Sequence, residues 1–100
     1  MINLDAKLSE KIFESDIEQK PTRAGYGVGL VQAGDENKNV VALCADLTES
    51  THTEAFAKKY PDRYFQVGVA EQNMATIASG LCISGKIPFI ASYATFSPGR

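Results

Sequence analysis

The chain has 100 residues, of which 44% are hydrophobic, and its formal net charge at pH 7 is −2. A chain of this length forms one small domain with a limited core, because it buries only about 60 to 70% of the surface that its unfolded form exposes. The small net charge and the lack of a basic run give no reason to expect nucleic acid or a membrane as partner, and no apolar stretch approaches the ~20 residues of a membrane-spanning helix. We therefore expect a globular cytoplasmic protein.

The first twenty residues are polar and are followed by Pro21. Leu8, Ile12 and Phe13 have a weak helical spacing within this segment. We expect residues 1–20 to form an arm or a lead-in helix ahead of a domain that occupies residues 21–100.

Residues 22–33 are predicted to form the first helix of the domain. The apolar residues of this segment fall on one helical face. They are Ala24, Val28, Leu30 and Val31. Gly25, Gly27 and Gly29 each lower the helix propensity by about 1 kcal/mol relative to alanine. These glycines do not form a dinucleotide-binding loop, because no strand precedes them and their spacing differs from that motif.

The run from Val40 to Ala45, VVALCA, is short, apolar and follows a surface turn at residues 35–39. Such a run with β-branched residues is typical of a parallel strand buried on both faces. The next segment supplies Asp, Ser and Thr residues that can cap a helix from Thr53 to Lys59, which ends ahead of Pro61.

Two further strands are predicted at residues 64–67 and 87–92, with a long helix between them from Glu71 to about Gly85. Gly85 suits a helix C-terminal cap, and Lys86 complements the negative end of the helix. Strands that alternate with helices predict an α/β fold of three layers, with a mostly parallel sheet between helices on both faces. Ligands bind such sheets at the carboxyl ends of the strands.

Candidate functional residues follow each of the three predicted strands. They are Asp46, Glu71, and the aromatic pair Tyr93 and Phe96. Glu71 is the most informative of them, because it lies between a strand and the first turn of a helix, whose amino end favours an ionised carboxylate. Each residue also has a structural alternative: a cap for Asp46, a dipole-compensating glutamate for Glu71, and core packing for the aromatic pair.

The stretch PDRYFQVGVAEQNMATIASGLCISGKIPFIASYATF resembles the pyrimidine-binding domain of the transketolase family of thiamine diphosphate enzymes. The resemblance extends over roughly residues 20–100. It implies that Glu71 bonds N1′ of the cofactor's aminopyrimidine and activates the cofactor. It also implies that Tyr93 and Phe96 form an aromatic wall for this ring, although many members of the family have phenylalanine where this chain has Tyr93. Asp46, in the segment DLT, would lie beside the thiazolium ring.

The same resemblance matches Arg23 and Ser50 to residues that contact the phosphate of a sugar substrate. An arginine fork and a hydroxyl are both suited to a phosphate dianion. A surface charge for Arg23 and a helix N-cap for Ser50 remain open as alternatives.

The chain has no GDG segment followed by an asparagine, which is the family's site for magnesium and the cofactor's diphosphate. The resemblance therefore implies the amino-terminal portion of the second subunit of a split transketolase. This portion would be inactive alone and would need a diphosphate-binding subunit, which carries Mg²⁺, in a homo- or hetero-oligomer. The complete enzyme would transfer a two-carbon ketol unit between sugar phosphates with thiamine diphosphate.

Two other functions stay open at this point. One is a related thiamine enzyme, either a 1-deoxy-D-xylulose-5-phosphate synthase or the β component of a 2-oxo acid dehydrogenase. The other is a non-catalytic interaction domain in which Glu71 is structural. Arg23 and Ser50 favour a transketolase over the related thiamine enzymes.

The remaining reactive side chains carry no predicted chemistry. Cys44 and Cys82 lie in apolar segments without metal-ligand spacing, so both are expected to be buried, reduced thiols, and no metal ligands are predicted in this chain. His52 lies in a polar THT segment. It is expected to be solvated or to cap a helix.

Overall fold

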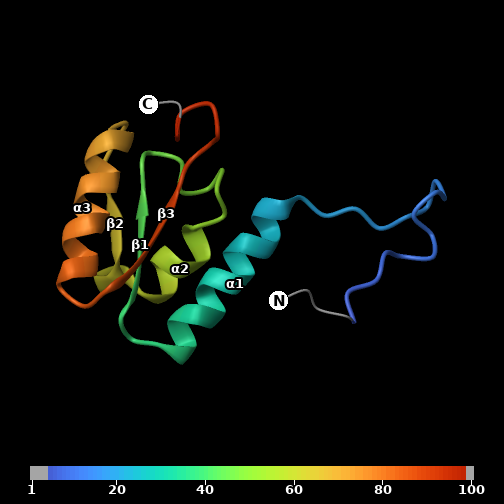
Figure 1. Cartoon of the computed structure of the whole chain (residues 1–100), viewed down its shortest axis with the longest axis horizontal. Helices are drawn as coiled ribbons and strands as arrows, with labels where there is room; N and C mark the ends of the chain where they lie inside the picture. Colours follow the sequence, from blue (N-terminus) through green and yellow to red (C-terminus); the bar gives the residue numbers. More distant parts are fainter. Residues whose placement is uncertain (1–4, 99–100) are drawn as a thin grey trace.

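The computed structural model describes residues 5–98, which form a parallel sheet with helices on both faces (Figure 1). Strand β1 (Val40–Cys44) lies between β2 (Tyr64–Gln66) and β3 (Ile87–Ala91), in the order β2-β1-β3. Both pairings are parallel. The predicted α/β class and three-layer arrangement are confirmed, and each strand lies within one residue of its predicted bounds.

The register of the sheet brings the three strand ends level with one another. Cys44, the last residue of β1, pairs with Gln66 of β2 and with Ala91 of β3. The backbone N–H of Val67 then donates to the carbonyl oxygen of Cys44 at 3.0 Å. The segments that follow the three strands therefore begin at one edge of the sheet, as the alternation of strands and helices predicts.

Helices α1 (Thr22–Glu36) and α2 (Glu54–Lys59) cover one face of the sheet. Leu30 of α1 and Phe56 of α2 are buried against Val40 and Ala42 of β1. Full burial of a side chain such as Leu or Phe stabilises the fold by roughly 1.5 to 3 kcal/mol.

Helix α3 (Glu71–Ile83) covers the opposite face. Met74 and Ala78 of this helix pack against Val41 and Leu43. Successive side chains of a strand point to opposite faces, so the alternate residues of β1 enter the two core clusters in turn. The continuous apolar sequence of β1 follows from this double burial.

Helix α1 presents a different face to the core from the one expected. Its buried residues are Gly27, Leu30 and Gly34, whereas Val28 is 71% exposed. The glycines lie inside because other segments approach the helix closely there. The predicted apolar face was therefore wrong at Val28, and the helix continues to Glu36, three residues beyond its predicted end.

The end of α3 contains one confirmed prediction and one correction. Gly85 has a φ of +82°, and the N–H of Lys86 donates to Leu81 O at 2.9 Å, which forms the predicted glycine cap. Cys44 is buried but Cys82 is exposed, contrary to expectation. The buried positions of α3 are Glu71, Met74 and Ala78, followed by the half-buried Leu81, so Cys82 lies at the margin of the buried stripe near the end of the helix.

The short 3₁₀ helix η1 (Pro61–Arg63) carries an arginine that binds the carboxyl-terminal end of α1. The Arg63 guanidinium donates to Gly34 O at 3.1 Å and to Asn37 O at 3.2 Å. It also lies 3.7 Å from the centre of the Tyr60 ring. Carbonyl groups at the end of α1 that lack helical partners are satisfied in this way.

Residues 5–20 extend away from α1 as an irregular arm with turns and no helix (Figure 1). Leu8 and Phe13 of this arm are 79% and 98% exposed. Residues 1–4 and 99–100, which belong to the expected arm and domain, lie outside the described residues. Within the described residues, no helix is long and apolar enough to cross a membrane.

We predict that two glycines of α1 respond in opposite ways to alanine. A Cβ at Gly27 would lie 2.6 Å from the carbonyl oxygen of His52, whereas a Cβ at Gly29 would meet nothing within 4 Å. Gly27→Ala should lower the free energy of unfolding by about 1 to 3 kcal/mol, and Gly29→Ala should raise it by up to ~1 kcal/mol. Urea unfolding measures both, and a shift of the same sign in both variants would contradict the close approach.

Candidate functional site

Asp46 lies in the loop that follows β1 and has a left-handed backbone with a φ of 60°. Aspartate is one of the few residues that adopt this conformation with little strain. Its N–H donates to Oε1 of Gln66 at 2.7 Å, and its side chain is exposed. The strand end and the bond to Gln66 hold Asp46 at the carboxyl edge of the sheet.

Gln66, the last residue of β2, connects several segments at this edge. Its Oε1 also accepts the N–H of Gly68 at 3.1 Å, and its Nε2 donates to Thr48 Oγ1 at 3.1 Å and more weakly to Tyr64 Oη at 3.4 Å. The Thr48 and Tyr64 hydroxyl groups also contact each other. Sequence reasoning missed Gln66, because its partners Asp46 and Thr48 belong to the segment after β1 and are far from it in the sequence.

Glu71 is the first residue of α3, and only 7% of it is exposed. The N-cap is Ala70, which has no side chain to cap the first turn. Glu71 lines a cavity of about 450 Å³ formed by residues 69–73. A carboxylate at a helix amino end is stabilised in its ionised form by the free N–H groups and the helix dipole. Glu71 is therefore a buried carboxyl group at a helix amino end, beside a cavity.

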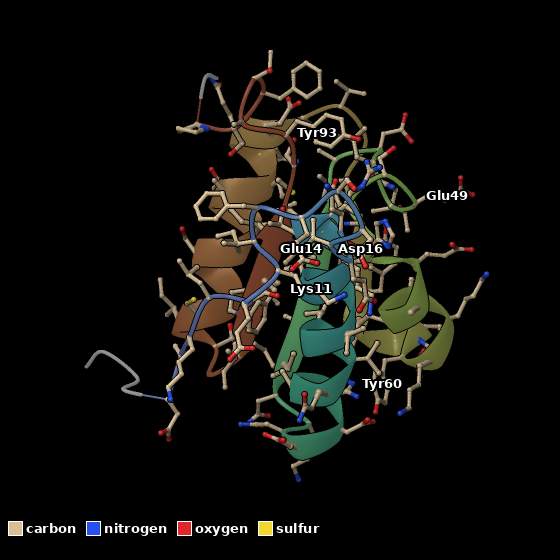
Figure 2. The ribbon with its side chains drawn as sticks, turned by 90° about the vertical axis from the view of Figure 1, so that its right-hand side faces the viewer. Lys11, Glu14, Asp16, Glu49, Tyr60 and Tyr93 are labelled. Atoms are coloured by element: carbon tan, nitrogen blue, oxygen red, sulfur yellow. The ribbon has the colours of Figure 1, made fainter. Side chains whose placement is uncertain are left out.

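A second cavity, of about 400 Å³, opens between α1, the loop after β1 and the end of β3. Nη1 of Arg23 donates to Ser50 O and to Tyr93 Oη, each at 3.4 Å. Figure 2 shows Tyr93 at the same end of the domain as Glu49, the neighbour of Ser50 in the loop after β1. Three residues singled out in the sequence thus meet at this cavity.

Tyr93 and Phe96 follow β3, and their rings stack on each other. Their ring centres are 6.3 Å apart and the ring planes differ by 24°. The N–H of Phe96 donates to Tyr93 O at 2.9 Å, so a tight turn after β3 sets this stacking. Offset stacked rings offer a flat apolar surface to another aromatic ring.

The predicted residues do not all line one cavity. Arg23, Ser50 and Tyr93 line the second cavity, while Glu71 lines the first, and no residue lines both. Met74, one turn after Glu71 on α3, lines the second cavity. The first turns of α3 thus border both cavities.

Buried threonines hold the loop between β1 and α2. The hydroxyl groups of Thr51 and Thr53 lie 2.7 Å apart, and Thr51 Oγ1 donates to Leu47 O at 2.8 Å. Thr53 is the N-cap of α2, but its side chain makes no capping hydrogen bond. His52 between them is exposed and has a φ of 59°.

Two hydroxyl groups at the second cavity are buried without a hydrogen-bond partner among the described residues. They are Tyr26 Oη and Ser92 Oγ. Burial raises the pKa of Tyr26 to about 12, and the Cys44 side chain adds to this shift. The Thr53 hydroxyl opposes it but stays outside hydrogen-bond geometry with Tyr26. Tyr26 is therefore a neutral phenol at physiological pH.

Acidic, histidine and cysteine side chains do not gather into a metal site in this part of the chain. Among residues 5–98, no group of three such side chains is placed to hold a metal ion.

Comparison with known proteins identifies the family to which this chain belongs. The family model described as the transketolase pyrimidine binding domain matches residues 18–98. A curated relative, the putative transketolase C-terminal section of Methanocaldococcus jannaschii, is 49% identical over 81 residues, which are 81% of this chain and 26% of the relative. The 1-deoxy-D-xylulose-5-phosphate synthase of Clostridium acetobutylicum is 37% identical over 91 residues, which are 90% of this chain and 15% of the synthase.

A solved structure gives the same result. It is a split-gene transketolase described as an inactive beta4 tetramer, and it matches with a TM-score of 0.70 and 51% sequence identity. The match covers 79% of this chain and 26% of that chain. The present chain thus spans about a quarter, or less, of the length of these relatives.

We predict that Tyr26 makes stability depend on pH in the alkaline range. Its pKa is about 12 in the folded chain and 10.0 in its ordinary state, so its contribution is complete below pH 10 and is lost as the pH rises towards 12. Tyr26→Phe should reduce the loss of unfolding free energy over this range by about 2 kcal/mol. Urea unfolding at pH 7, 10 and 11.5 measures this, with Tyr93→Phe as control. An identical pH profile for Tyr26→Phe and the original chain would refute the effect.

Proposed function

Because the chain belongs to the family of transketolase pyrimidine-binding domains, we propose that it forms the pyrimidine-binding part of a thiamine diphosphate-dependent transketolase. The complete enzyme transfers a two-carbon ketol unit between sugar phosphates. The observation that carries this proposal is the buried carboxylate of Glu71, which lies at a helix amino end beside a cavity and within the region that the family model matches.

Glu71 is the catalytic residue of the proposal. Thiamine diphosphate, when bound, supplies the electron sink for breaking and forming carbon–carbon bonds. An ionised carboxylate is the side chain that accepts a charge-assisted hydrogen bond from a protonated ring nitrogen and holds the proton there. The start of α3 places the Glu71 carboxyl group beside its cavity, and burial there strengthens a charge-assisted hydrogen bond to the aminopyrimidine N1′.

The other cofactor contacts come from the segments that follow β1 and β3. The stacked rings of Tyr93 and Phe96 offer an aromatic surface for the flat pyrimidine, so that stacking holds the ring while Glu71 selects one of its edges. The exposed carboxylate of Asp46 offsets the positive charge of the thiazolium ring.

Arg23 and Ser50 bind the phosphate of the sugar substrate in this proposal. The Arg23 guanidinium is exposed, and its two hydrogen bonds are long, at 3.4 Å each. Weak bonds of this length are exchanged at little cost for charge-assisted bonds to a phosphate dianion. Ser50 lines the same cavity, which leaves its hydroxyl group within reach of the same ligand.

We assign the cofactor's diphosphate and its Mg²⁺ to a partner, a diphosphate-binding transketolase subunit. One relative is named as a C-terminal section and another as a split-gene transketolase, so division of the enzyme between chains occurs among proteins similar to this one. The proposal therefore includes a homo- or hetero-oligomer, located in the cytoplasm, in which this chain alone is inactive.

A second candidate is supported by the relatives. Several of them are 1-deoxy-D-xylulose-5-phosphate synthases, including one from Thermobifida fusca that is 49% identical over 67 residues. Product analysis of the assembled enzyme separates the two functions. Formation of 1-deoxy-D-xylulose 5-phosphate would identify a synthase, whereas exchange of two-carbon units between sugar phosphates would identify a transketolase.

We predict that Glu71→Gln in the assembled enzyme removes most turnover while the fold remains intact. An amide can hydrogen-bond N1′ but cannot hold a proton there as a carboxylate does, and loss of one well-placed group of this kind lowers the rate by about 10²- to 10³-fold. Steady-state rates at equal cofactor loading measure the effect, with Glu36→Gln at the exposed end of α1 as control. Turnover at the level of the original enzyme would exclude Glu71 as the activating residue.

We also predict that the 100-residue chain alone does not bind thiamine diphosphate measurably, with or without Mg²⁺. Its residues reach only the pyrimidine and thiazolium rings in this proposal, so the diphosphate contributes no binding energy until the partner is present. Isothermal titration calorimetry of the chain, and of the full-length subunit with its partner, tests this. Tight stoichiometric binding by the chain alone would overturn the division of the site between subunits.

A further inference from the structure

Two left-handed turns at the carboxyl edge of the sheet depend on one side-chain oxygen. Asp46 and Gly68 have φ values of 60° and 69°. The backbone N–H of each donates to the same atom, Oε1 of Gln66, at 2.7 Å and 3.1 Å. Asp46 follows β1 and Gly68 follows β2. This oxygen therefore joins the two segments that carry Asp46 and Glu71, the residues whose carboxylates are proposed to contact the cofactor.

The orientation of the Gln66 amide is fixed by its other end. Nε2 donates to Thr48 Oγ1 at 3.1 Å and faces the hydroxyl of Tyr64. A rotation of the amide by half a turn would place its N–H groups against two backbone N–H donors and its oxygen towards the hydroxyl groups. The carbonyl oxygen is therefore the atom that meets both turns.

The turn at Gly68 determines where α3 begins. The N–H of Ala70 donates to Gly68 O at 2.8 Å, and the N–H of Met74 donates to Ala70 O at 2.9 Å, which starts the helix. Glu71 directly follows Ala70 and is the first residue of this helix. A change in the Gly68 turn therefore moves the first turn of α3 and the carboxylate that it carries.

We propose that Gln66 is the positioning residue of the site, because its one carboxamide oxygen fixes both the Asp46 turn and the turn that leads to Glu71. This inference rests on the proposed function. Gln66 itself is exposed, so its replacement leaves the two N–H groups accessible to water and does not bury an unpaired donor. Loss of the oxygen thus loosens the two turns without unfolding the sheet.

The first test follows the two turns directly in this chain by amide hydrogen exchange. In Gln66→Met, which keeps the side-chain length and removes the oxygen, the amides of Asp46 and Gly68 should exchange at least about tenfold faster. The Val67 amide, which donates to Cys44 O within the sheet, should be unchanged and so reports that the fold persists. Gln66→Glu keeps an acceptor for both amides and should preserve their protection, because the hydroxyl groups opposite it can turn to donate.

The matched control is Gln32→Met, the same change at an exposed position of α1. It should leave the exchange of all three amides unaltered. Unchanged exchange at Asp46 and Gly68 in Gln66→Met would overturn the proposal, whatever the cofactor affinity or turnover of the assembled enzyme.

The second test uses calorimetry of the assembled enzyme with thiamine diphosphate and Mg²⁺. Gln66→Met should raise the cofactor Kd by about tenfold at unchanged stoichiometry, corresponding to about 1.4 kcal/mol, and Gln66→Glu should restore it. A lower stoichiometry at unchanged Kd would mean that Gln66 only maintains folding, and an unchanged Kd with faster exchange would mean that the turns do not position the site. Either outcome overturns the proposed role of Gln66 but leaves the proposed function standing. Failure of the original enzyme to bind the cofactor would overturn the proposed function and this role together.

Discussion

Burial of β1 on both faces is the constraint from which the arrangement of the whole domain follows. Because Val41 and Leu43 face α3 while Val40 and Ala42 face α1 and α2, a shift of β1 by one residue would exchange the two core clusters. The register is therefore fixed, and with it the level at which all three strands end. The position of the functional edge is a consequence of apolar packing in the centre of the sheet.

Polar side chains at that edge fix the loops that leave the strands, which the packing of the apolar core does not determine. A loop that leaves a buried strand must provide partners for backbone N–H groups that the ladder no longer satisfies. Oε1 of Gln66 accepts hydrogen bonds from two such N–H groups, and the Thr51 hydroxyl donates to the Leu47 carbonyl oxygen. The core thus places the strand ends to within a residue, while side-chain hydrogen bonds fix the direction in which each loop departs. The proposed site, which uses the carboxylates of Asp46 and Glu71, would depend on both the core and these hydrogen bonds.

The sequence predicted those features that depend on local pattern. The run at Val40, the glycine at the end of α3 and the strand ends that precede Asp46 and Glu71 each have a signature within a few residues. Gly27 and Gln66 have none, since the first is explained by the carbonyl of His52 and the second by the N–H of Asp46, both about 20 or more residues away in the sequence. The prediction that Cys82 is buried was wrong for a related reason. Which side of α3 is buried depends on the residues of the sheet that pack against it.

The separation of the two cavities bears on how such a domain could act. Glu71 and the Arg23 cavity share no lining residue, yet Met74 borders the second cavity from the same helix that begins with Glu71. In the proposed function, α3 would carry the cofactor-binding carboxylate at its first residue and an adaptable apolar side chain one turn later, at the edge of the Arg23 cavity. The hydrogen bond from Arg23 to Tyr93 would then join the substrate and cofactor residues directly. In this assignment, substitutions at Arg23 of α1 should alter substrate recognition with little effect on Glu71, because α3 is anchored in the core by Met74 and Ala78.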